Sequence, residues 1–243
     1  MSSGVLKIKP GQKNIFQQKV MQLLPDGGNL NMCLTCGACA SGCPASGLED
    51  MDPRKLLRMA ALGLDDEILS TQWAWMCTMC QRCIRVCPMK IDIPQLVLNI
   101  RNHWAKDNQP KGIRSSCDVA LKNDTCSAMG ASEEDWRFVV ADVLEEVREN
   151  QPGFEALEAP MDKKGAYFFL NQNSREPVTE PDEMVPLWKI LHLAGADWTY
   201  GSKGWAAENY CMFCADFESW EHIVRVKAKA VDDLGCKVWL NTE

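Results

Sequence analysis

Residues 33–44, CLTCGACASGCP, and residues 77–88, CTMCQRCIRVCP, carry eight of the thirteen cysteines in two copies of one pattern, CxxCxxCxxxCP. A [4Fe–4S] cube needs four thiolates, of which three can come from one tight loop while the fourth arrives from elsewhere in the chain. With two motifs, the fourth cysteine of each can ligate the cluster of the other. The doubled motif therefore predicts two [4Fe–4S] clusters as cofactors.

The expected ligands follow from this exchange of fourth cysteines between the motifs. The first cluster is assigned to Cys33, Cys36, Cys39 and Cys87, and the second to Cys77, Cys80, Cys83 and Cys43. No residue is assigned a catalytic role.

Zinc and disulfides explain the pattern less well than iron–sulfur clusters do. Zinc needs two separated ligand pairs, which gives no reason for a third cysteine at the same interval or for the proline after the fourth. A disulfide framework needs an oxidising compartment, yet residues 1–14, MSSGVLKIKPGQKN, lack the apolar core of a secretory signal. We therefore expect a cytoplasmic protein, with any membrane association made through a partner protein.

The composition of the chain argues against several classes of protein. The 243 residues are 46% apolar and 24% charged, which allows a buried core in one or two domains. The net charge of −7 argues against nucleic-acid binding, which requires a basic surface. No run approaches the roughly 18 consecutive apolar residues of a membrane-spanning helix. We expect a globular protein with no nucleic-acid partner and no direct membrane span.

Helices are predicted around both cysteine motifs. Asp52 and Asp92 are each followed within two residues by a proline and then by apolar residues at helical spacing. No strand-like alternation appears near either motif. We expect an N-terminal extension over residues 1–27 and an all-helical (alpha-helical ferredoxin) dicluster domain over residues 28–107.

The pattern changes in the second half of the chain. Residues 108–160 are expected to form a connector followed by a helix, which Ser132 and Asp135 begin with a capping box. Beyond it, strand, helix, strand, helix and strand are expected over residues 166–170, 183–194, 197–200, 219–234 and 236–240. This order predicts a small α/β domain with a mostly parallel sheet over residues 161–243, and an α+β class for the whole chain.

The first half resembles the C subunit of heterodisulfide reductase and the related subunits of sulfur-metabolising complexes. The resemblance rests on the two cysteine motifs, on MDPRKLLRMAALGL between them and on IDIPQLVLNIR after them. It implies an electron-transfer iron–sulfur subunit of an oxidoreductase, not catalytic alone. The implied partners are a flavin-side or ferredoxin-side electron-donor subunit and a catalytic CCG-domain subunit that converts a disulfide or another sulfur compound.

The second half is similar to one repeat of the cysteine-rich CCG domain, as in heterodisulfide reductase D-like subunits and sulfite-reduction complexes. Its ligand positions, however, are not cysteines. Asn171 follows the strand YFFL, and Ala206-Ala207-Glu208 stand where Cys-Cys-Gly is expected. The final cysteine motif of that family would fall near residue 243. We expect a degenerate repeat that is either truncated relative to the family or complete and used to dock a catalytic partner.

The remaining cysteines leave several functions open. Cys211 and Cys214 form a CxxC pair, and with Cys236 they are compatible with an inert structural role, a redox dithiol or a third metal site. The dithiol would make the chain a self-contained thiol–disulfide reductase, and a further alternative is an iron–sulfur redox sensor. Cys117 and Cys126 have no ligand spacing and are left unassigned.

Charge also distinguishes the two motifs. Arg82 and Arg85 lie inside the second, whereas the first loop, LTCGACASGC, carries no charge. Because positive charge stabilises the reduced, more negative state of a cluster, the second cluster is expected to have the higher potential.

Overall fold

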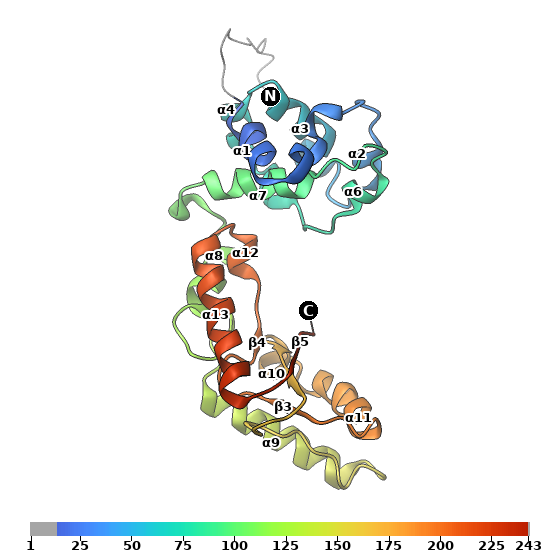
Figure 1. Cartoon of the computed structure of the whole chain (residues 1–243), viewed down its shortest axis with the longest axis vertical. Coiled ribbons are helices and arrows are strands. Elements are labelled where there is room, and N and C mark those ends of the chain that lie inside the picture. Colours follow the sequence, from blue (N-terminus) through green and yellow to red (C-terminus); the bar gives the residue numbers. More distant parts are fainter. Residues whose placement is uncertain (1–13, 243) are drawn as a thin grey trace. The chain divides into compact units, whose positions relative to one another are not determined.

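The chain forms two compact units that divide after Pro110 (Figure 1). The structure is a computed structural model and describes residues 14–242. Helices dominate the first unit, and the second adds short parallel strands. The predicted α+β class is confirmed.

The first unit is helical throughout its described part, residues 14–110, which contains no strand. In chain order its elements are α1 (Ile15–Leu23), η1 (Pro25–Met32), α2 (Ala38–Gly42), η2 (Leu48–Asp50), α3 (Pro53–Ala61), α4 (Asp65–Leu69), α5 (Trp73–Met76), α6 (Arg82–Val86), α7 (Ile93–His103) and η3 (Lys106–Asn108). The all-helical prediction for this region is confirmed. Helix α1 lies in a segment for which only an extension was expected.

Two predicted helix starts are confirmed by their caps. The Asp52 carboxylate accepts hydrogen bonds from the backbone N–H groups of Arg54 and Lys55, at 2.8 and 3.2 Å. The Asp92 carboxylate likewise accepts from the N–H of Gln95 at 3.0 Å. These bonds satisfy N–H groups that have no partner inside the helix, and so fix where α3 and α7 begin.

The core of the first unit supports the cysteine motifs. Helices α1, α3 and α7 pack against one another, and their buried side chains include Phe16, Val20, Leu56, Leu57, Leu96, Val97 and Ile100. Several cysteines of both motifs are half-buried against this cluster. The loops that carry them therefore rest on a close-packed surface rather than standing free in solvent.

The second unit combines a small parallel sheet with helices. Its elements are α8 (Lys111–Ala120), α9 (Glu133–Asn150), β1 (Phe168–Leu170), β2 (Gln172–Asn173), α10 (Glu176–Thr179), η4 (Pro181–Met184), α11 (Val185–Leu193), β3 (Trp198–Tyr200), β4 (Ala206–Ala207), α12 (Tyr210–Phe213), α13 (Phe217–Leu234) and β5 (Val238–Leu240). The strand order is β3-β1-β5, all parallel, and β2 pairs with β4. In Figure 1 the strands lie between α13 and α11. The mostly parallel sheet is confirmed.

One local prediction is wrong: α8 occupies part of the segment expected to be a connector. Its buried residues are Cys117 and Ala120, which pack in a small apolar cluster. Such small side chains give a weak periodicity, so tertiary contact decides the helix here. The following helix α9 begins as predicted, because Ser132 Oγ accepts from the N–H of Asp135 at 3.1 Å while the Asp135 carboxylate accepts from the N–H of Ser132.

An aromatic cluster anchors α9 to the sheet. Trp136 is fully buried, stacks on Trp205 with ring centroids 4.1 Å apart, and meets Tyr200 edge to face at 4.9 Å. Its indole N–H donates to the carbonyl oxygen of Gly201 at 3.1 Å. One side chain thus joins the helix, the end of β3 and the loop before β4.

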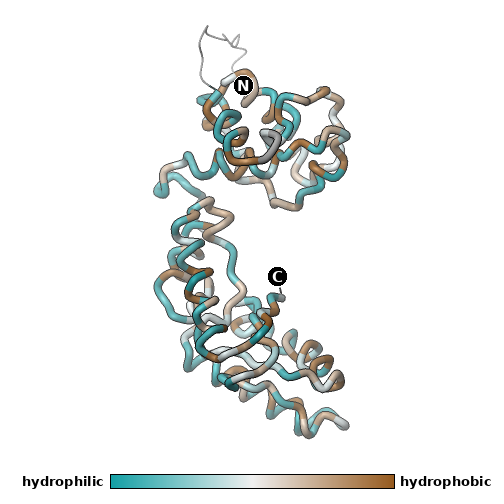
Figure 2. The backbone as a smooth tube through the Cα atoms, viewed as in Figure 1, coloured by the Kyte–Doolittle hydropathy of each residue, from teal (hydrophilic) through white to brown (hydrophobic). Residues whose placement is uncertain are grey.

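Hydropathy and helix length decide whether any segment of the described chain, residues 14–242, could cross a membrane. Figure 2 shows hydrophilic and hydrophobic stretches alternating along the tube. Between residues 14 and 242, no helix is both long enough and apolar enough to cross a bilayer.

Replacing Trp136 by alanine is expected to lower the free energy of unfolding of the second unit by about 3–5 kcal/mol, because it removes a buried aromatic side chain and leaves a cavity. The measurement is urea denaturation of the full chain followed by circular dichroism. Phe138→Ala is the matched control on the same helix, since that side chain is 67% exposed, and its change should stay within about 0.5 kcal/mol. Equal losses in the two variants would contradict the anchoring role of Trp136.

Candidate functional site

The two cysteine loops have the same backbone conformation. In each loop the residues on both sides of the second cysteine have positive φ: Thr35 (59°) and Gly37 (83°), and Met79 (58°) and Gln81 (61°). Three of these four residues are not glycine, so the loops hold strained backbone. Loops with such backbone turn successive N–H groups toward one concave face. This arrangement binds anions and occurs at many iron–sulfur sites.

Backbone N–H groups reach the first sulfur of each loop. The N–H of Thr35 donates to Cys33 Sγ at 3.4 Å. In the second loop the backbone N–H of Met79 acts to lower the pKa of the Cys77 thiol, although burial outweighs it. Such hydrogen bonds stabilise a thiolate and help to set the potential of a cluster bound to it.

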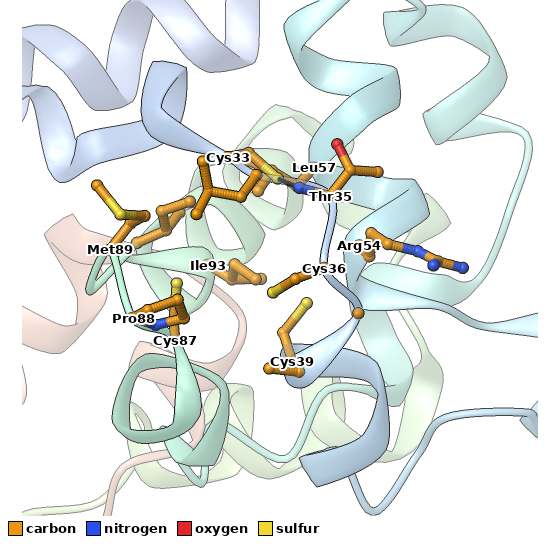
Figure 3. A pocket seen from close by; sticks show the side chains of 14 residues that line it. Cys33, Thr35, Cys36, Cys39, Arg54, Leu57, Cys87, Pro88, Met89 and Ile93 are labelled. Carbon is orange, nitrogen blue, oxygen red and sulfur yellow. Dashed lines mark hydrogen bonds between the residues drawn. The ribbon is translucent and has the colours of Figure 1, made fainter.

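The structure gathers the eight motif cysteines around two cavities. Cys33, Cys36 and Cys39 line the first together with Cys87 of the other motif. Figure 3 shows these four side chains around one opening, with Leu57 and Ile93 on its wall. The second cavity is lined by the complementary set, Cys77, Cys80, Cys83 and Cys43. The grouping is the one that the sequence predicted, and iron ligation by these residues remains a prediction.

Two short helices explain why the fourth cysteines are exchanged. The N-cap residues of α2 and α6, Gly37 and Gln81, both lie in the left-handed region, so each helix turns away from its own loop. The fourth cysteine of each motif, Cys43 or Cys87, is the C-cap residue that directly follows the helix. Because α2 packs against α6, each carries its last cysteine to the cavity of the opposite motif.

The donors around both cavities fit an iron–sulfur cluster. Neither lining contains a carboxylate or a histidine, and each contains four cysteines and mostly apolar side chains. Thiolates are soft ligands that select iron–sulfur clusters, zinc or copper(I), and an apolar wall limits access of water. Among residues 14–242 no three His, Cys, Asp or Glu side chains are arranged to hold a single metal ion.

The cysteines differ in exposure and in acidity. Cys36 and Cys80 are exposed, whereas the other six are partly buried. Burial raises the pKa of Cys39 and Cys77, and raises that of Cys83 to about 12. A thiolate at these positions is unfavourable unless a cation lies beside it, as iron in a cluster does. Conversely, the N–H of Arg82 lowers the pKa of exposed Cys80.

A buried cation beside the second cavity was missed by the sequence analysis. Arg101 on α7 is 1% exposed, and its Nε donates to the carbonyl oxygen of Ala74 at 2.9 Å. Its guanidinium also donates to the carbonyl oxygen of Cys77. No spacing signal relates this residue to Cys77, which lies 24 positions earlier. By contrast, Arg82 and Arg85 are exposed.

The disulfide in the second unit differs from the pair that the CxxC spacing suggests. Cys117 on α8 and Cys211 on α12 form a disulfide across 94 residues, so the bonded partner of Cys211 is not Cys214. Cys126 and Cys214 are buried without being disulfide-bonded, and Cys236 lies half-buried just before β5. Sequence spacing could not reveal this pair, because its members meet only where α8 packs against α12.

Asn171 has a structural role where the CCG resemblance places a cysteine. It is fully buried, and its Nδ2 donates to the carbonyl oxygens of Gly204 and Trp205 at 2.8 and 2.7 Å. Its Oδ1 accepts from the indole N–H of Trp239 in β5. Ala206–Ala207, at the expected Cys-Cys position, form strand β4. Asn171 therefore links strands and loops through hydrogen bonds, and Ala206–Ala207 take part in strand pairing.

Comparison with known proteins supports the cluster-binding region. Residues 29–91 match the family of the 4Fe-4S dicluster domain. Over 80 residues, 33% of this chain and 43% of the relative, the sequence is 40% identical to the C subunit of the H(2):CoB-CoM heterodisulfide,ferredoxin reductase of Methanothermobacter marburgensis. It is 28% identical over 173 residues, 71% of this chain and 79% of the relative, to the iron-sulfur C subunit of the CoB–CoM heterodisulfide reductase of Methanopyrus kandleri.

A protein of Archaeoglobus profundus that resembles the C subunit of heterodisulfide reductase is 33% identical over 96 residues, which are 38% of this chain and 50% of that protein. The chain thus spans half or less of the length of the Methanothermobacter and Archaeoglobus relatives. The chain is an iron–sulfur protein similar to the C subunit of heterodisulfide reductase, which confirms the resemblance of the first half. The resemblance of the second half to a CCG repeat stays a prediction.

Asn171→Ala is expected to lower the free energy of unfolding by about 1–3 kcal/mol, because it leaves buried polar groups without partners. Iron content should not change, since the side chain holds strands together and binds no metal. Urea denaturation and iron analysis of the same preparation measure both effects. Asn150→Ala, an exposed residue that bonds within α9, is the matched control. A loss of iron in Asn171→Ala alone would contradict the structural role.

Proposed function

We propose that this chain is an electron-transfer iron–sulfur subunit of a heterodisulfide-reductase-like oxidoreductase complex, and that it holds two [4Fe–4S] clusters. The observation that carries the proposal is the pair of four-cysteine cavities built from exchanged motifs. When bound, such clusters supply one-electron redox chemistry. The thiolates of each cavity would be the protein ligands, with Cys87 completing the first set and Cys43 the second.

Exposure supports exchange of electrons with other proteins. One cysteine of each set, Cys36 or Cys80, reaches the surface, while the opposite side of each loop rests on the core. A partner docked over either loop would approach the bound cluster closely. We assign the partners to a catalytic CCG-domain subunit and to a flavin-side or ferredoxin-side donor, in the cytoplasm.

The second unit is proposed to dock the catalytic partner rather than to perform the chemistry. The ligand positions of a CCG repeat are occupied by Asn171, which bonds to backbone, and by the small residues of β4. Neither can supply the thiolates that a catalytic cluster needs. The scaffold is therefore available for contact with a partner while the first unit holds the clusters.

Exchanged ligation predicts which pairs of substitutions act on the same cluster. Cys43→Ala should reduce iron from about eight to about four per chain. Adding Cys83→Ala should cause no further loss, because both residues line the second cavity. Adding Cys39→Ala instead should remove nearly all iron. Anaerobic iron and sulfide analysis, with low-temperature electron paramagnetic resonance of the reduced chain, measures these outcomes.

The control for this series is Cys236→Ala, which should retain all iron because that residue lines neither cavity. If Cys43→Ala combined with Cys39→Ala retained about four iron atoms, each motif would ligate its own cluster and the exchange would be wrong. A wild-type chain that binds no iron under anaerobic reconstitution would overturn the proposed function itself.

Arg101→Gln is expected to lower the midpoint potential of the second cluster, because a buried cation stabilises the reduced state more than an exposed one does. Arg82→Ala and Arg85→Ala should shift it less, since water screens those exposed side chains. Arg101→Lys keeps the charge and should recover part of the shift. Redox titration monitored by electron paramagnetic resonance gives all four values. An unchanged potential in Arg101→Gln, with the signal intact, would rule out the effect.

A further inference from the structure

Three cysteines that line neither cavity lie together in the second unit. Cys117 on α8 and Cys211 on α12 are disulfide-bonded, and Cys214 follows Cys211 by three residues. All three side chains are 0% exposed. Because Cys214 retains helical backbone angles at the end of α12, it shares a face with Cys211. Cys117, Cys211 and Cys214 belong to one buried apolar cluster, so a thiol lies near the disulfide in a water-poor site.

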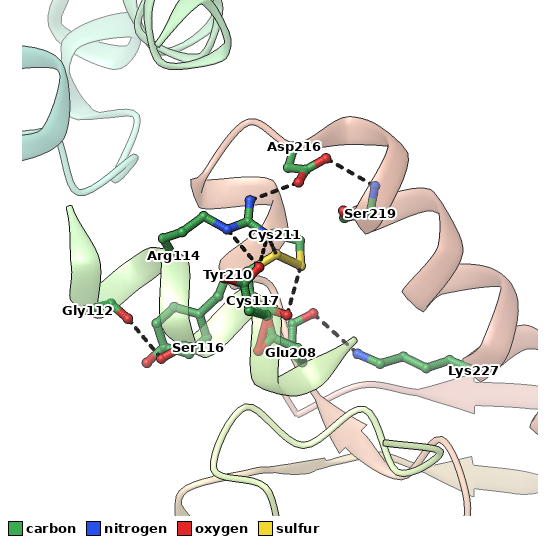
Figure 4. The surroundings of a disulfide bond; sticks show 11 residues. Gly112, Arg114, Ser116, Cys117, Glu208, Tyr210, Cys211, Asp216, Ser219 and Lys227 are labelled. Carbon is green, nitrogen blue, oxygen red and sulfur yellow. Dashed lines mark hydrogen bonds and ion pairs between the residues drawn. A yellow bond between two sulfur atoms is a disulfide. The ribbon is translucent and has the colours of Figure 1, made fainter. Parts of the chain in front are cut away.

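A positive charge lies against this disulfide. Arg114, one turn before Cys117 on α8, has its Nη2 3.3 Å from Cys117 Sγ. Asp216 accepts from Nη1 at 2.8 Å, and Asp118 binds the opposite edge of the guanidinium. Both the Arg114 and Asp216 side chains are largely buried, at 11% and 6% exposure. Figure 4 shows the guanidinium held between Asp216 and the sulfur atoms.

This arrangement favours one direction of bond cleavage. A thiolate left on Cys117 would be stabilised by the adjacent guanidinium, and a more stable leaving thiolate departs faster in thiol–disulfide exchange. The carboxylates of Asp118 and Asp216 keep the guanidinium in place. They reduce its net charge at longer range, but Cys117 is the sulfur that it contacts directly.

The reducing conditions that cluster binding requires bear on the role of this disulfide. The eight cysteines of the cavities must be thiolates to bind iron, so the protein acquires its clusters under reducing conditions. Disulfides in reducing compartments are usually transient and serve catalysis or redox sensing. This disulfide has a third cysteine and a cation close to it. It therefore fits that class better than it fits the class of purely structural disulfides.

We propose that Cys117, Cys211 and Cys214 form a redox-active thiol–disulfide site in which the bond moves between two partners of Cys211. The Cys214 thiolate attacks the sulfur of Cys211, a Cys211–Cys214 bond forms, and the electron pair leaves on Cys117. The proton given up by Cys214 is taken up at Cys117, so the exchange needs no external electrons. Full reduction to three thiols takes two electrons and two protons from a dithiol, which is itself oxidised to a disulfide.

The exchange has a structural consequence. In the first state the bond ties α8 to α12, which lies 94 residues later in the chain. In the second state the bond closes only the turn of α12, and α8 is held by non-covalent packing alone. Such a site is separate from the electron-relay clusters, and it contains three cysteines where the sequence spacing indicated only the Cys211–Cys214 dithiol.

The test is thiol trapping on the full, cluster-loaded chain. The protein is equilibrated anaerobically in dithiothreitol buffers of defined oxidised-to-reduced ratio, alkylated, and mapped by mass spectrometry, while circular dichroism monitors the fold. The expected result is reduction of the Cys117–Cys211 bond in the folded chain, together with a trapped Cys211–Cys214 species. Cys214→Ser should abolish that species and keep the Cys117–Cys211 bond.

Arg114→Gln should slow opening of the bond about tenfold, because the leaving thiolate loses its cation, and Arg114→Lys should recover part of the rate. Arg225→Gln, in an exposed ion pair with Glu221 on α13, is the matched control and should leave the rate unchanged. Iron content should be equal in all variants, which separates this proposal from the electron-relay function.

Four results would overturn the proposal. The bond could open only when the circular dichroism signal is lost, which would identify it as a structural staple. The wild-type chain could yield no trapped Cys211–Cys214 species at any ratio of oxidised to reduced dithiothreitol, or Arg114→Gln could react at the wild-type rate with its fold intact. Iron above about eight atoms per chain that is lost in Cys211→Ser would identify a third metal site instead.

Discussion

The packing of α2 against α6 is the contact on which the cluster-binding unit depends. Each of these helices is only five residues long and could not persist alone in water. Together they bring Cys43 and Cys87 to opposite cavities, so neither four-cysteine set is complete without the other motif. Assembly of the four-cysteine sets and helix packing are therefore coupled, and the core formed by α1, α3 and α7 provides the support for both.

Burial decides which cations act on sulfur in this protein. Arg82 and Arg85 are close to the second motif in sequence but point to solvent, where water weakens their influence. Arg101 is distant in sequence and buried, and it binds the carbonyl oxygen of Cys77 directly. In the second unit Arg114 contacts Cys117 Sγ from a similarly enclosed position. Because their surroundings have a low dielectric constant, these two guanidinium groups interact with nearby sulfur more strongly than the exposed arginines do.

A buried amide and a pair of stacked indoles hold the second unit together around its small sheet. Asn171 uses its amide to join the end of β1 to the loop before β4 and to β5. The stacked pair of Trp136 and Trp205 fills the space between α9 and that loop. Hydrogen bonds and aromatic packing thus connect the strands and the loop before β4 in this unit.

The sequence alone determined the cysteine motifs and how their cysteines group around two cavities, the starts of α3, α7 and α9, and the parallel sheet, because these follow from local spacing, capping residues and periodicity. It did not reveal helix α8, the burial of Arg101, or the bond between Cys117 and Cys211. Each of these depends on residues far apart in the chain that meet only after folding. Only the tertiary structure decided them, since burial and contact across 94 residues leave no local pattern.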